Sequence, residues 1–167
     1  MPTIIFKATE ACNANCVYCD VVHRKKPRTI SLDLLKVVFE RFNEYLLECP
    51  KEEIRVIWHG GEPCMAGLDL YKTALQYTKE ICSETKDRLK FAVQSNITMM
   101  NQDFLDVFME MGIHVIGTSY EPIHGVRGLG KKRDSRLYNK KFFYWCPVNG
   151  YNALFLLILM VDKPLSA

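Results

Sequence analysis

The chain has 167 residues, of which 49% are hydrophobic and 25% are charged, and its formal net charge is +3. This length and composition are typical of a single globular domain with a hydrophobic core. The small net charge argues against a nucleic-acid-binding protein or one that binds an acidic membrane surface through a strongly basic face. The two basic clusters, at 24–28 and 131–133, are interpreted as solvated loops.

The N-terminus lacks the basic start, apolar region and cleavage site of a signal peptide. The longest apolar run, Ala153–Val161, is much shorter than the ~20 residues that cross a bilayer. We therefore expect a cytoplasmic protein without a membrane segment. Because thiols stay reduced in that compartment, the seven cysteines favour metal binding or catalysis over disulfides.

Strands and helices are predicted to alternate along the first half of the chain. Thr3–Ala8 is a short β-branched and aromatic run, which indicates a strand. Ser31 is a suitable N-cap for a helix to about Glu48, in which apolar residues recur at helical spacing. Ile54–Trp58 predicts a second strand, and Leu68–Cys82 predicts a second helix.

The same alternation continues through the second half. Asn101 is a suitable cap for a helix that ends near Gly112. The wholly apolar run Leu154–Val161 is typical of a strand buried on both faces of a parallel sheet. The other elements expected here are the strands Leu89–Val93 and His114–Thr118 and a weaker helix at Asp134–Trp145.

Five strands with four helices between them predict an α/β fold built on a parallel sheet. The chemically distinctive segments each follow a predicted strand, at 12–19, 60–63, 95–96 and 119–122. Ligands bind at the carboxyl ends of parallel strands in both barrels and open sheets. We therefore expect these four segments to share one site.

Cys12, Cys16 and Cys19 are spaced four and then three residues apart. A loop of this span can wrap one corner of a cubane iron–sulfur cluster, with each thiolate on a different iron. Three ligands for four irons leave one iron open, which suits chemistry better than electron storage. Two alternatives stay open. One is a zinc site with His23 as the fourth ligand, and the other is a ferredoxin-like electron carrier with a fourth cysteine.

The fourth cysteine of such a carrier would come from Cys49, Cys64, Cys82 or Cys146. None of these shows ligand spacing, and we interpret them as small apolar residues. Cys64 is the exception to note, because it follows Glu62 and Pro63 and is expected near the site.

The pattern Cys-x3-Cys-x2-Cys, with the aromatic Tyr18 before the last cysteine, resembles the signature of the radical S-adenosylmethionine (SAM) superfamily. The segment Thr-Glu-Ala-Cys-Asn at 9–13 also resembles that family. The resemblance implies a [4Fe–4S] cluster whose open iron is chelated by the amino and carboxylate groups of SAM. One electron from the cluster would cleave SAM to methionine and a 5′-deoxyadenosyl radical, which abstracts a substrate hydrogen. Tyr18 is expected near the adenine.

The family motif that meets the SAM ammonium group corresponds here to Gly60, Gly61, Glu62 and Pro63. Glycines let a backbone approach a ligand closely, and the glutamate supplies a carboxylate. The longer string at 58–67 resembles the branch of anaerobic sulfatase-maturating enzymes and related peptide maturases of the SPASM type. His59 has two open interpretations, a substrate-side residue or a histidine bonded to the backbone.

The resemblance assigns further SAM contacts to the ends of the third and fourth strands. Ser95 and Asn96 stand where the branch carries Thr-Asn-Gly, with Ile97 in place of the glycine. Ser119 is expected to reach the SAM carboxylate or ribose.

An arginine shortly after the fourth strand usually pairs with the SAM carboxylate in this family, and its planar guanidinium suits that contact. Arg127 is the predicted residue, and Arg133 and Arg136 are the alternatives. In the maturase branch the catalytic acid or base lies beyond the part that this chain matches, so the sequence identifies no catalytic residue.

A full barrel of this superfamily has six strand–helix units, and the sixth is not found here. We therefore expect a partial (β/α)6 radical SAM barrel, open at its C-terminal edge, as one domain over residues 1–167. Both a truncated enzyme and a naturally short one are compatible with this pattern. Because an open edge is an aggregation hazard, a partner chain is expected to cover it.

The implied partners are a peptide or protein substrate and a reducing donor such as flavodoxin or ferredoxin. The implied function is radical modification of a peptide or protein side chain. The alternative is a module that binds cluster and SAM without turnover.

Overall fold

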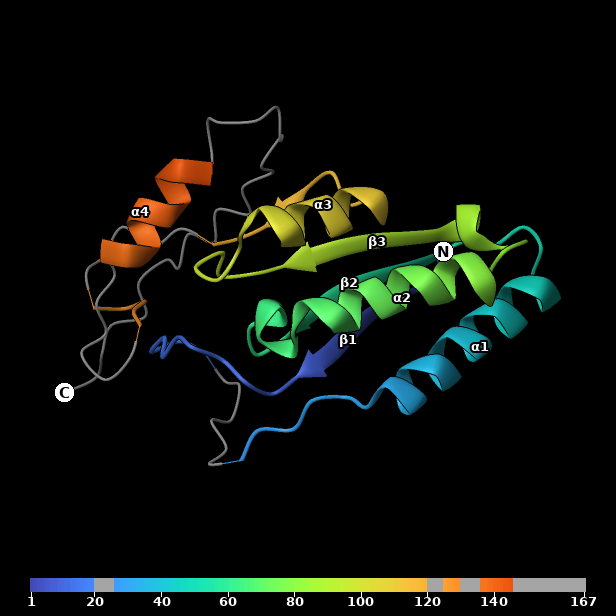
Figure 1. The fold of residues 1–167 in the computed structure, drawn as a ribbon, viewed down its shortest axis with the longest axis horizontal. Coiled ribbons are helices and arrows are strands. Elements are labelled where there is room, and N and C mark those ends of the chain that lie inside the picture. Colours follow the sequence, from blue (N-terminus) through green and yellow to red (C-terminus); the bar gives the residue numbers. More distant parts are fainter. Residues whose placement is uncertain (20–25, 120–124, 130–135, 146–167) are drawn as a thin grey trace.

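The structure is a computed structural model that describes residues 1–19, 26–119, 125–129 and 136–145. Strands and helices alternate along the chain, as the sequence predicts (Figure 1). The strands are β1 (Thr3–Thr9), β2 (Ile54–Gly60), β3 (Leu89–Gln94) and β4 (Ile116–Gly117). The α-helices are α1 (Leu32–Glu48), α2 (Leu68–Glu80), α3 (Gln102–Glu110) and α4 (Arg136–Trp145), and two short 3-10 helices are η1 (Pro63–Ala66) and η2 (Lys86–Arg88).

The four described strands form one parallel sheet in the order β1-β2-β3-β4. Phe6 pairs with Trp58, and Trp58 pairs with Val93, so the strands run side by side in register. All four carboxyl ends therefore lie at the same edge of the sheet. The predicted α/β class with a parallel sheet is confirmed, while the predicted strand Leu154–Val161 lies outside the described residues.

The core lies between one face of the sheet and the helices α1, α2 and α3 (Figure 1). Along β2, Ile54, Val56 and Trp58 are buried, whereas the alternate residues between them are more exposed. The helices pack in chain order, α1 against α2 and α2 against α3. A sheet whose helices gather on one face is the wall of a barrel, since a doubly wound sheet has helices on both faces.

Both predicted helix caps are present. The Ser31 hydroxyl accepts a hydrogen bond from Leu34 N at 3.2 Å, and Asn101 Oδ1 accepts one from Phe104 N at 3.1 Å. Each cap satisfies a backbone donor that the first turn of a helix leaves free. The caps fix where α1 and α3 begin, and hence how far each helix lies from the strand before it.

β4 is shorter than the predicted strand His114–Thr118, because the end of α3 uses the preceding backbone. Gly112 has φ +77°, and Gly112 N and Ile113 N bond to the carbonyls of Met109 and Phe108. These are the two hydrogen bonds of a Schellman motif. The chain is therefore still leaving the helix at Ile113, and pairing with β3 starts only at Ile116.

α2 is also shorter than predicted. The amides of Ile81 and Cys82 both bond to Tyr77 O, so the regular ladder of α2 ends at Glu80 rather than at Cys82. α4 starts at Arg136, and the two residues before it that were predicted to be helical lie outside the described residues.

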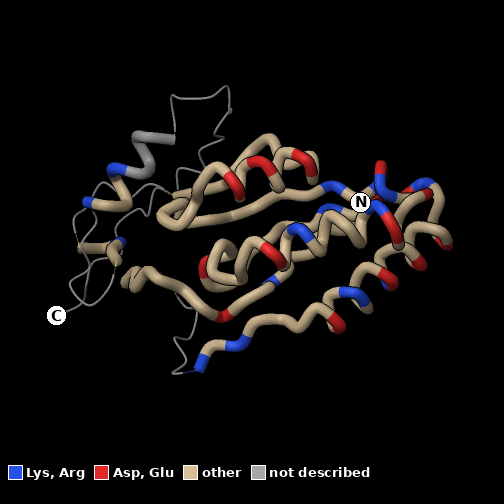
Figure 2. Tube along the Cα trace, in the orientation of Figure 1, with Lys and Arg blue, Asp and Glu red and all other residues tan. Residues whose placement is uncertain are grey.

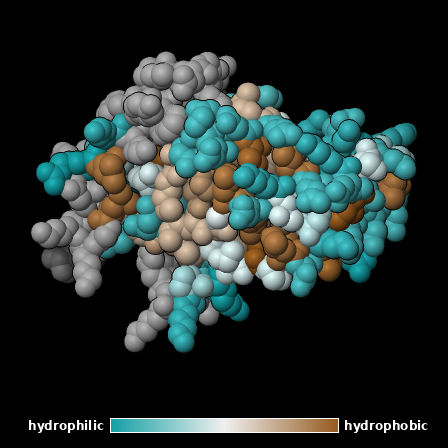
Figure 3. All heavy atoms as spheres, viewed as in Figure 1, coloured by the Kyte–Doolittle hydropathy of each residue, from teal (hydrophilic) through white to brown (hydrophobic). Residues whose placement is uncertain are grey.

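Charged residues of both signs are spread along α1 and α2, whereas those of α3 are acidic (Figure 2). The same face shows hydrophobic residues exposed between hydrophilic ones (Figure 3). No helix in the described part of the chain combines the length and apolar character needed to cross a bilayer.

Candidate functional site

A cavity of about 300 Å³ lies at the carboxyl ends of the strands. Its walls come from the loop after β1 and from the ends of β2, β3 and β4, with Arg127 from the segment before α4. The lining residues are Cys12, Ala14, Cys16, Tyr18, Cys19, His59, Gly60, Gly61, Glu62, Gln94, Ser95, Asn96, Ser119 and Arg127. Eleven of the twelve predicted site residues are among them, and the exception is Pro63, which is buried at the start of η1.

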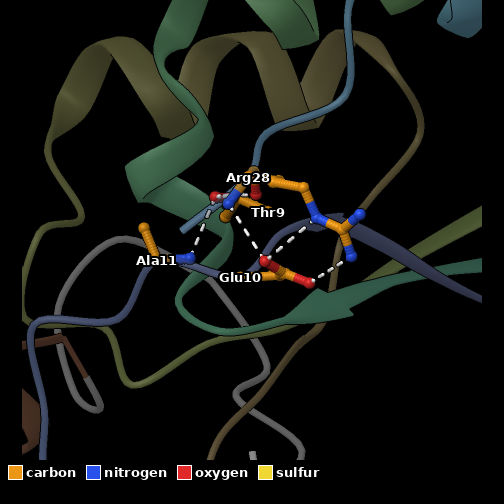
Figure 4. Close-up of polar contacts among 4 residues, drawn as sticks. All are labelled: Thr9, Glu10, Ala11 and Arg28. Atoms are coloured by element: carbon orange, nitrogen blue, oxygen red, sulfur yellow. Dashed lines mark hydrogen bonds and ion pairs between the residues drawn. The ribbon is translucent and has the colours of Figure 1, made fainter. Parts of the chain in front are cut away.

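The loop that carries the three cysteines is closed at its base by Thr9, Glu10, Arg28 and Thr29, which we call the clasp. The hydroxyls of Thr9 and Thr29 lie 2.8 Å apart, and Glu10 N donates to Arg28 O at 2.8 Å. The Arg28 guanidinium donates to both oxygens of the Glu10 carboxylate, at 3.0 and 3.4 Å, and Arg28 N donates to the same group (Figure 4). The two ends of the cysteine loop are therefore held next to each other at the end of β1.

The far side of the cysteine loop pairs with the segment 126–129. Asn15 N donates to Gly128 O at 3.0 Å, and Val17 N donates to Val126 O at 2.9 Å. This short antiparallel pairing fixes the backbone on both sides of Cys16. It also places Arg127 beside the cysteine loop, although more than a hundred residues separate them in the sequence.

Cys12, Cys16 and Cys19 are free thiols that line the cavity together. Burial raises the pKa of the Cys12 thiol, and the charges of Glu62 and of the other two cysteines raise it further, while a hydrogen bond from Ala14 N lowers it. Because metal ligation requires thiolates, a cluster bound here would have to displace this proton.

Cys12, Cys16 and Cys19 line one cavity, and three thiolates, each on a different iron, are the ligands that a cubane cluster would take here. Among the described residues, no group of three or more His, Cys, Asp or Glu side chains is placed to hold one metal ion. His23, the fourth ligand of the zinc alternative, lies outside the described residues.

Glu62 is a buried carboxylate, with 1% of its surface exposed, and three donors hold it. Its Oε1 accepts from Cys64 N at 3.1 Å and from the Ser95 hydroxyl at 2.7 Å, and its Oε2 accepts from Asn96 N at 2.7 Å. The Cys64 thiol also interacts with this carboxylate, so Glu62 is held on every side by the turn after β2 and the turn after β3. Burial first, and then the charge of Glu62, raises the pKa of the neighbouring Cys64 thiol.

Gly60 and Gly61 allow the backbone of the cysteine loop to approach closely. A Cβ at Gly61 would lie 2.1 Å from Ala11 O, and one at Gly60, where φ is +120°, would lie 2.5 Å from Thr9 O. Two backbone hydrogen bonds, Gly61 N to Thr9 O and Glu62 N to Ala11 O, form across this close approach. Both glycines also line the cavity, and their contact with SAM stays a prediction.

The turn after β3 holds Ser95, Asn96 and Ile97. Ile97 has φ +57°, in the left-handed region that favours glycine, which explains why glycine is usual at this position in the resembling branch. Ile97 N donates to the Ser95 hydroxyl at 2.8 Å, and that hydroxyl in turn donates to Glu62. The turn therefore serves to hold the buried carboxylate.

Arg127 is 93% buried and is held by Ser119 and Tyr138. Its Nη1 donates to the Ser119 carbonyl, to the Ser119 hydroxyl at 2.5 Å and to the Tyr138 hydroxyl at 3.2 Å. Its guanidinium carbon lies 4.2 Å from the centre of the Tyr138 ring, a cation–π contact. Arg127 Nε is buried without a hydrogen-bond partner in the described part of the chain.

Of the arginines predicted to contact SAM, Arg127 lines the cavity. Arg136, at the start of α4, is not among the described residues that line it. Arg133 lies outside the described residues. Tyr18 shares the cavity with Arg127 and Ser119. Burial raises the pKa of Tyr18 to about 12, although the positive charge of Arg127 opposes the shift.

Sequence reasoning missed three residues of the site region. Tyr138 lies outside the strand ends where ligands were sought, and only its aromatic character after Arg127 could have indicated a role. Gln94 lines the cavity, and its side chain occupies the space that a Cβ at Gly117 would take, 2.1 Å from Gln94 Oε1. Ala14 also lines the cavity. His59 is bonded to the backbone, since its Nδ1 accepts from Gly60 N at 2.7 Å. It also lines the cavity, and a substrate-side role stays a prediction.

No protein-family model matches the chain. A cysteine-type anaerobic sulfatase-maturating enzyme of Clostridium novyi is 26% identical over 174 residues, which cover 98% of this chain and 44% of that enzyme. A serine-type anaerobic sulfatase-maturating enzyme of Klebsiella aerogenes is 33% identical over 113 residues, which cover 66% of this chain and 27% of that enzyme.

Two solved structures have the same fold. The anSMEcpe enzyme with bound AdoMet and Kp18Cys peptide matches with a TM-score of 0.68 and 20% identity, over 92% of this chain and 42% of that one. BtrN in complex with AdoMet and 2-DOIA matches with a TM-score of 0.61 and 17% identity, over 92% of this chain and 55% of that one.

The fold matches that of these AdoMet-bound enzymes, with the parallel sheet and one-sided helices of a partial barrel. Within that class, the predicted resemblance to the anaerobic sulfatase-maturating enzymes is confirmed by the curated relatives. The chain spans less than half of the length of those two relatives.

Proposed function

We propose that this chain is the cluster- and SAM-binding part of a radical SAM oxidoreductase that modifies a peptide or protein side chain. The ligands of its [4Fe–4S] cluster would be Cys12, Cys16 and Cys19. When bound, this cluster supplies the electron that cleaves SAM reductively, and the resulting 5′-deoxyadenosyl radical abstracts a hydrogen atom from the substrate. This assignment treats residues 1–167 as a single domain.

The observation that carries this proposal is the pairing of opposite charges across a cavity that also holds the three thiols. Glu62 and Arg127 both line this cavity, and Arg127 Nε has no hydrogen-bond partner among the described residues. The amino-acid end of SAM carries one ammonium and one carboxylate group, which these two side chains complement. Tyr18 and Ser119 are left to contact the adenosine part.

A peptide or protein substrate is favoured because the curated relatives reported above are sulfatase-maturating enzymes. The Kp18Cys peptide in the anSMEcpe complex supports the same class. A low-potential donor such as flavodoxin or ferredoxin would supply the electron. The cytoplasmic location stays a prediction, as does a partner chain over the open edge of the sheet.

Anaerobic reconstitution tests the proposal. The protein is loaded with iron and sulfide, reduced with dithionite and mixed with SAM, and 5′-deoxyadenosine is measured by chromatography. We expect wild type to release it, Cys16→Ala to lose both cluster and product, and Cys49→Ala to behave as wild type. Cys49 is a suitable control because it is a free cysteine at the far end of α1.

A loaded cluster that yields no 5′-deoxyadenosine would favour the alternative, a module that binds cluster and SAM without turnover. The short span relative to the curated relatives is the observation that keeps this alternative in view. A cluster whose spectrum ignores SAM would instead indicate an electron carrier.

A further inference from the structure

Three polar side chains link the cysteine loop to the turn after β3. Asn96 Nδ2 donates to Asn13 Oδ1 at 2.8 Å, and Asn13 Nδ2 donates to Thr98 Oγ1 at 2.8 Å. The ring closes because Thr98 donates to Asn96 Oδ1 through both its hydroxyl, at 2.6 Å, and its backbone N–H, at 3.0 Å. We call Asn13, Asn96 and Thr98 the amide network.

The amide network contacts the first cysteine ligand. Asn96 Nδ2 also lies 4.0 Å from Cys12 Sγ, and Ala14 N donates to the same sulfur at 3.4 Å. The backbone of Asn96 faces the other way, since its N–H donates to Glu62 Oε2 at 2.7 Å. One residue thus bonds both the sulfur expected on the cluster and the carboxylate expected at the SAM ammonium group.

The side chain of Asn96 has no capacity left for SAM. A carboxamide offers two donor hydrogens and two acceptor lone pairs. The hydrogens are directed at Asn13 and Cys12, and the lone pairs are taken by the two bonds from Thr98. Asn96 is 94% buried, so water does not compete for these bonds. The family resemblance predicts that Asn96 contacts SAM; in this structure its side chain bonds within the chain instead.

We propose that the amide network is a positioning device that fixes Cys12 against Glu62 and raises the reduction potential of the cluster through the Asn96 N–H···S contact. This inference rests on the proposed function, namely that the three cysteines hold a cluster. An N–H dipole that points at a ligand sulfur stabilises added negative charge, and the reduced cluster carries one more negative charge than the oxidised cluster. The reduced form is therefore favoured while the donor is present.

The midpoint potential of the reconstituted cluster tests the inference. It is measured by dithionite titration with redox mediators, followed by electron paramagnetic resonance, together with iron content. Asn96→Ala removes the donor to Cys12 and should shift the potential to a more negative value. Thr98→Val keeps the shape of the side chain but removes the hydroxyl that orients both asparagines, and it should shift the potential the same way by less.

Thr85→Val is the matched control. The Thr85 hydroxyl is also buried and donates to an asparagine, Asn43 Oδ1 at 2.7 Å, but on the opposite side of the core from the cysteines. This variant loses a similar hydrogen bond and should keep the wild-type potential and iron content. A general loss of stability would lower the iron content of all three variants. The inferred role instead predicts that the midpoint potential shifts in Thr98→Val and stays at the wild-type value in Thr85→Val.

Failure of the two proposals can be told apart. If wild type forms no cluster, both are overturned. If wild type loads and reduces normally, but Asn96→Ala and Thr98→Val titrate at the wild-type potential, only the amide-network inference is overturned. If Asn96→Ala fails to fold, Thr98→Val decides alone, because it leaves the Cys12 contact atoms in place.

Discussion

Arg127 illustrates how a single buried residue can be preorganised for a ligand. Ser119 and Tyr138 occupy its Nη1 and one face of its guanidinium, while Nε has no hydrogen-bond partner among the described residues. A buried donor without a partner costs free energy in the empty protein. That cost is recovered when an acceptor such as a carboxylate enters the cavity.

The first prediction concerns this arginine. Arg127→Lys keeps the charge but loses the Nε donor and the planar stack, so SAM should bind about 10- to 100-fold more weakly, the equivalent of one charged hydrogen bond. Tyr138→Phe keeps the ring and loses only the hydroxyl, so a smaller loss is expected. Titration calorimetry on the reconstituted protein measures both. Arg136→Lys serves as control, and equal affinity of wild type and Arg127→Lys would exclude Arg127 from the SAM site.

The second prediction concerns Ile97, a β-branched residue with φ +57° and 4% exposure. Its backbone strain costs about 1–2 kcal/mol, whereas removing a buried isoleucine side chain costs about 2–5 kcal/mol. Packing outweighs strain, so Ile97→Gly should destabilise the protein by about 1–3 kcal/mol.

The matched variant Ile97→Ala loses the same packing but keeps the strain. The alanine variant should therefore be the less stable of the two, the reverse of the usual order in helices and strands. Urea unfolding midpoints decide this, and a more stable alanine variant would show that the turn adjusts without strain.

At the scale of elements, the cysteine loop depends on segments far from it in sequence. The clasp closes its base, and the segment 126–129 pairs with its far side. The Glu10–Arg28 ion pair is partly exposed, with Arg28 at 75% side-chain exposure, so its contribution to overall stability is small. Its effect is local, because it limits how far the two ends of the loop can separate.

The third prediction follows from this arrangement. Arg28→Ala should release iron to a chelator faster than wild type, by less than about fivefold, because exposed ion pairs are weak. Arg41→Ala is the control, since Arg41 also forms an exposed pair, with Glu44 at 2.5 Å on α1, away from the loop. The chelator assay is followed by absorbance, and equal rates for all three proteins would show that the Thr9–Thr29 contact and the backbone bonds suffice.

The local elements were predictable because their causes are local. Ser31 and Asn101 cap helices through bonds to residues three positions later, and the alternation of strands and helices shows in the spacing of apolar residues. The clasp and the position of Tyr138 were not predictable, because both depend on where distant segments meet. The glycines at 60 and 61 show the same limit, since the backbone that requires them belongs to another strand.

At the scale of the whole molecule, the parallel register explains why motifs from four places meet. Once β1, β2, β3 and β4 lie side by side, residues just after each strand must share one edge. The sequence therefore predicted which segments line the cavity. It could not predict which residues face each other across it, because side-chain partners such as Glu62 and Ser95 depend on the exact turn after each strand.

The last prediction is a dependence of stability on pH in the protein without its cluster. Burial raises the pKa of Cys82 to about 11 from an ordinary 9.0, and that of Tyr18 to about 12 from an ordinary 10.0. The pKa values of Cys12, Cys64 and Tyr71 are raised as well, each mainly by burial. Above pH 9 the folded protein therefore holds more protons than the unfolded chain, and its free energy of unfolding should fall as the pH rises.

Denaturant unfolding at pH 8, 9, 10 and 11 measures this fall, and Cys82→Ala isolates one contributor. Cys82 is completely buried in the core, where its thiol donates to Phe39 O at 3.6 Å, so the folded state keeps it protonated. Below pH 9 the variant should show the same flat dependence as wild type. Between pH 9 and 11 its slope should be smaller by up to one proton per molecule, because the unfolded chain no longer ionises at this position. A wild-type stability that stays constant to pH 11 would mean that these thiols and phenols ionise in the folded state as freely as in the unfolded one.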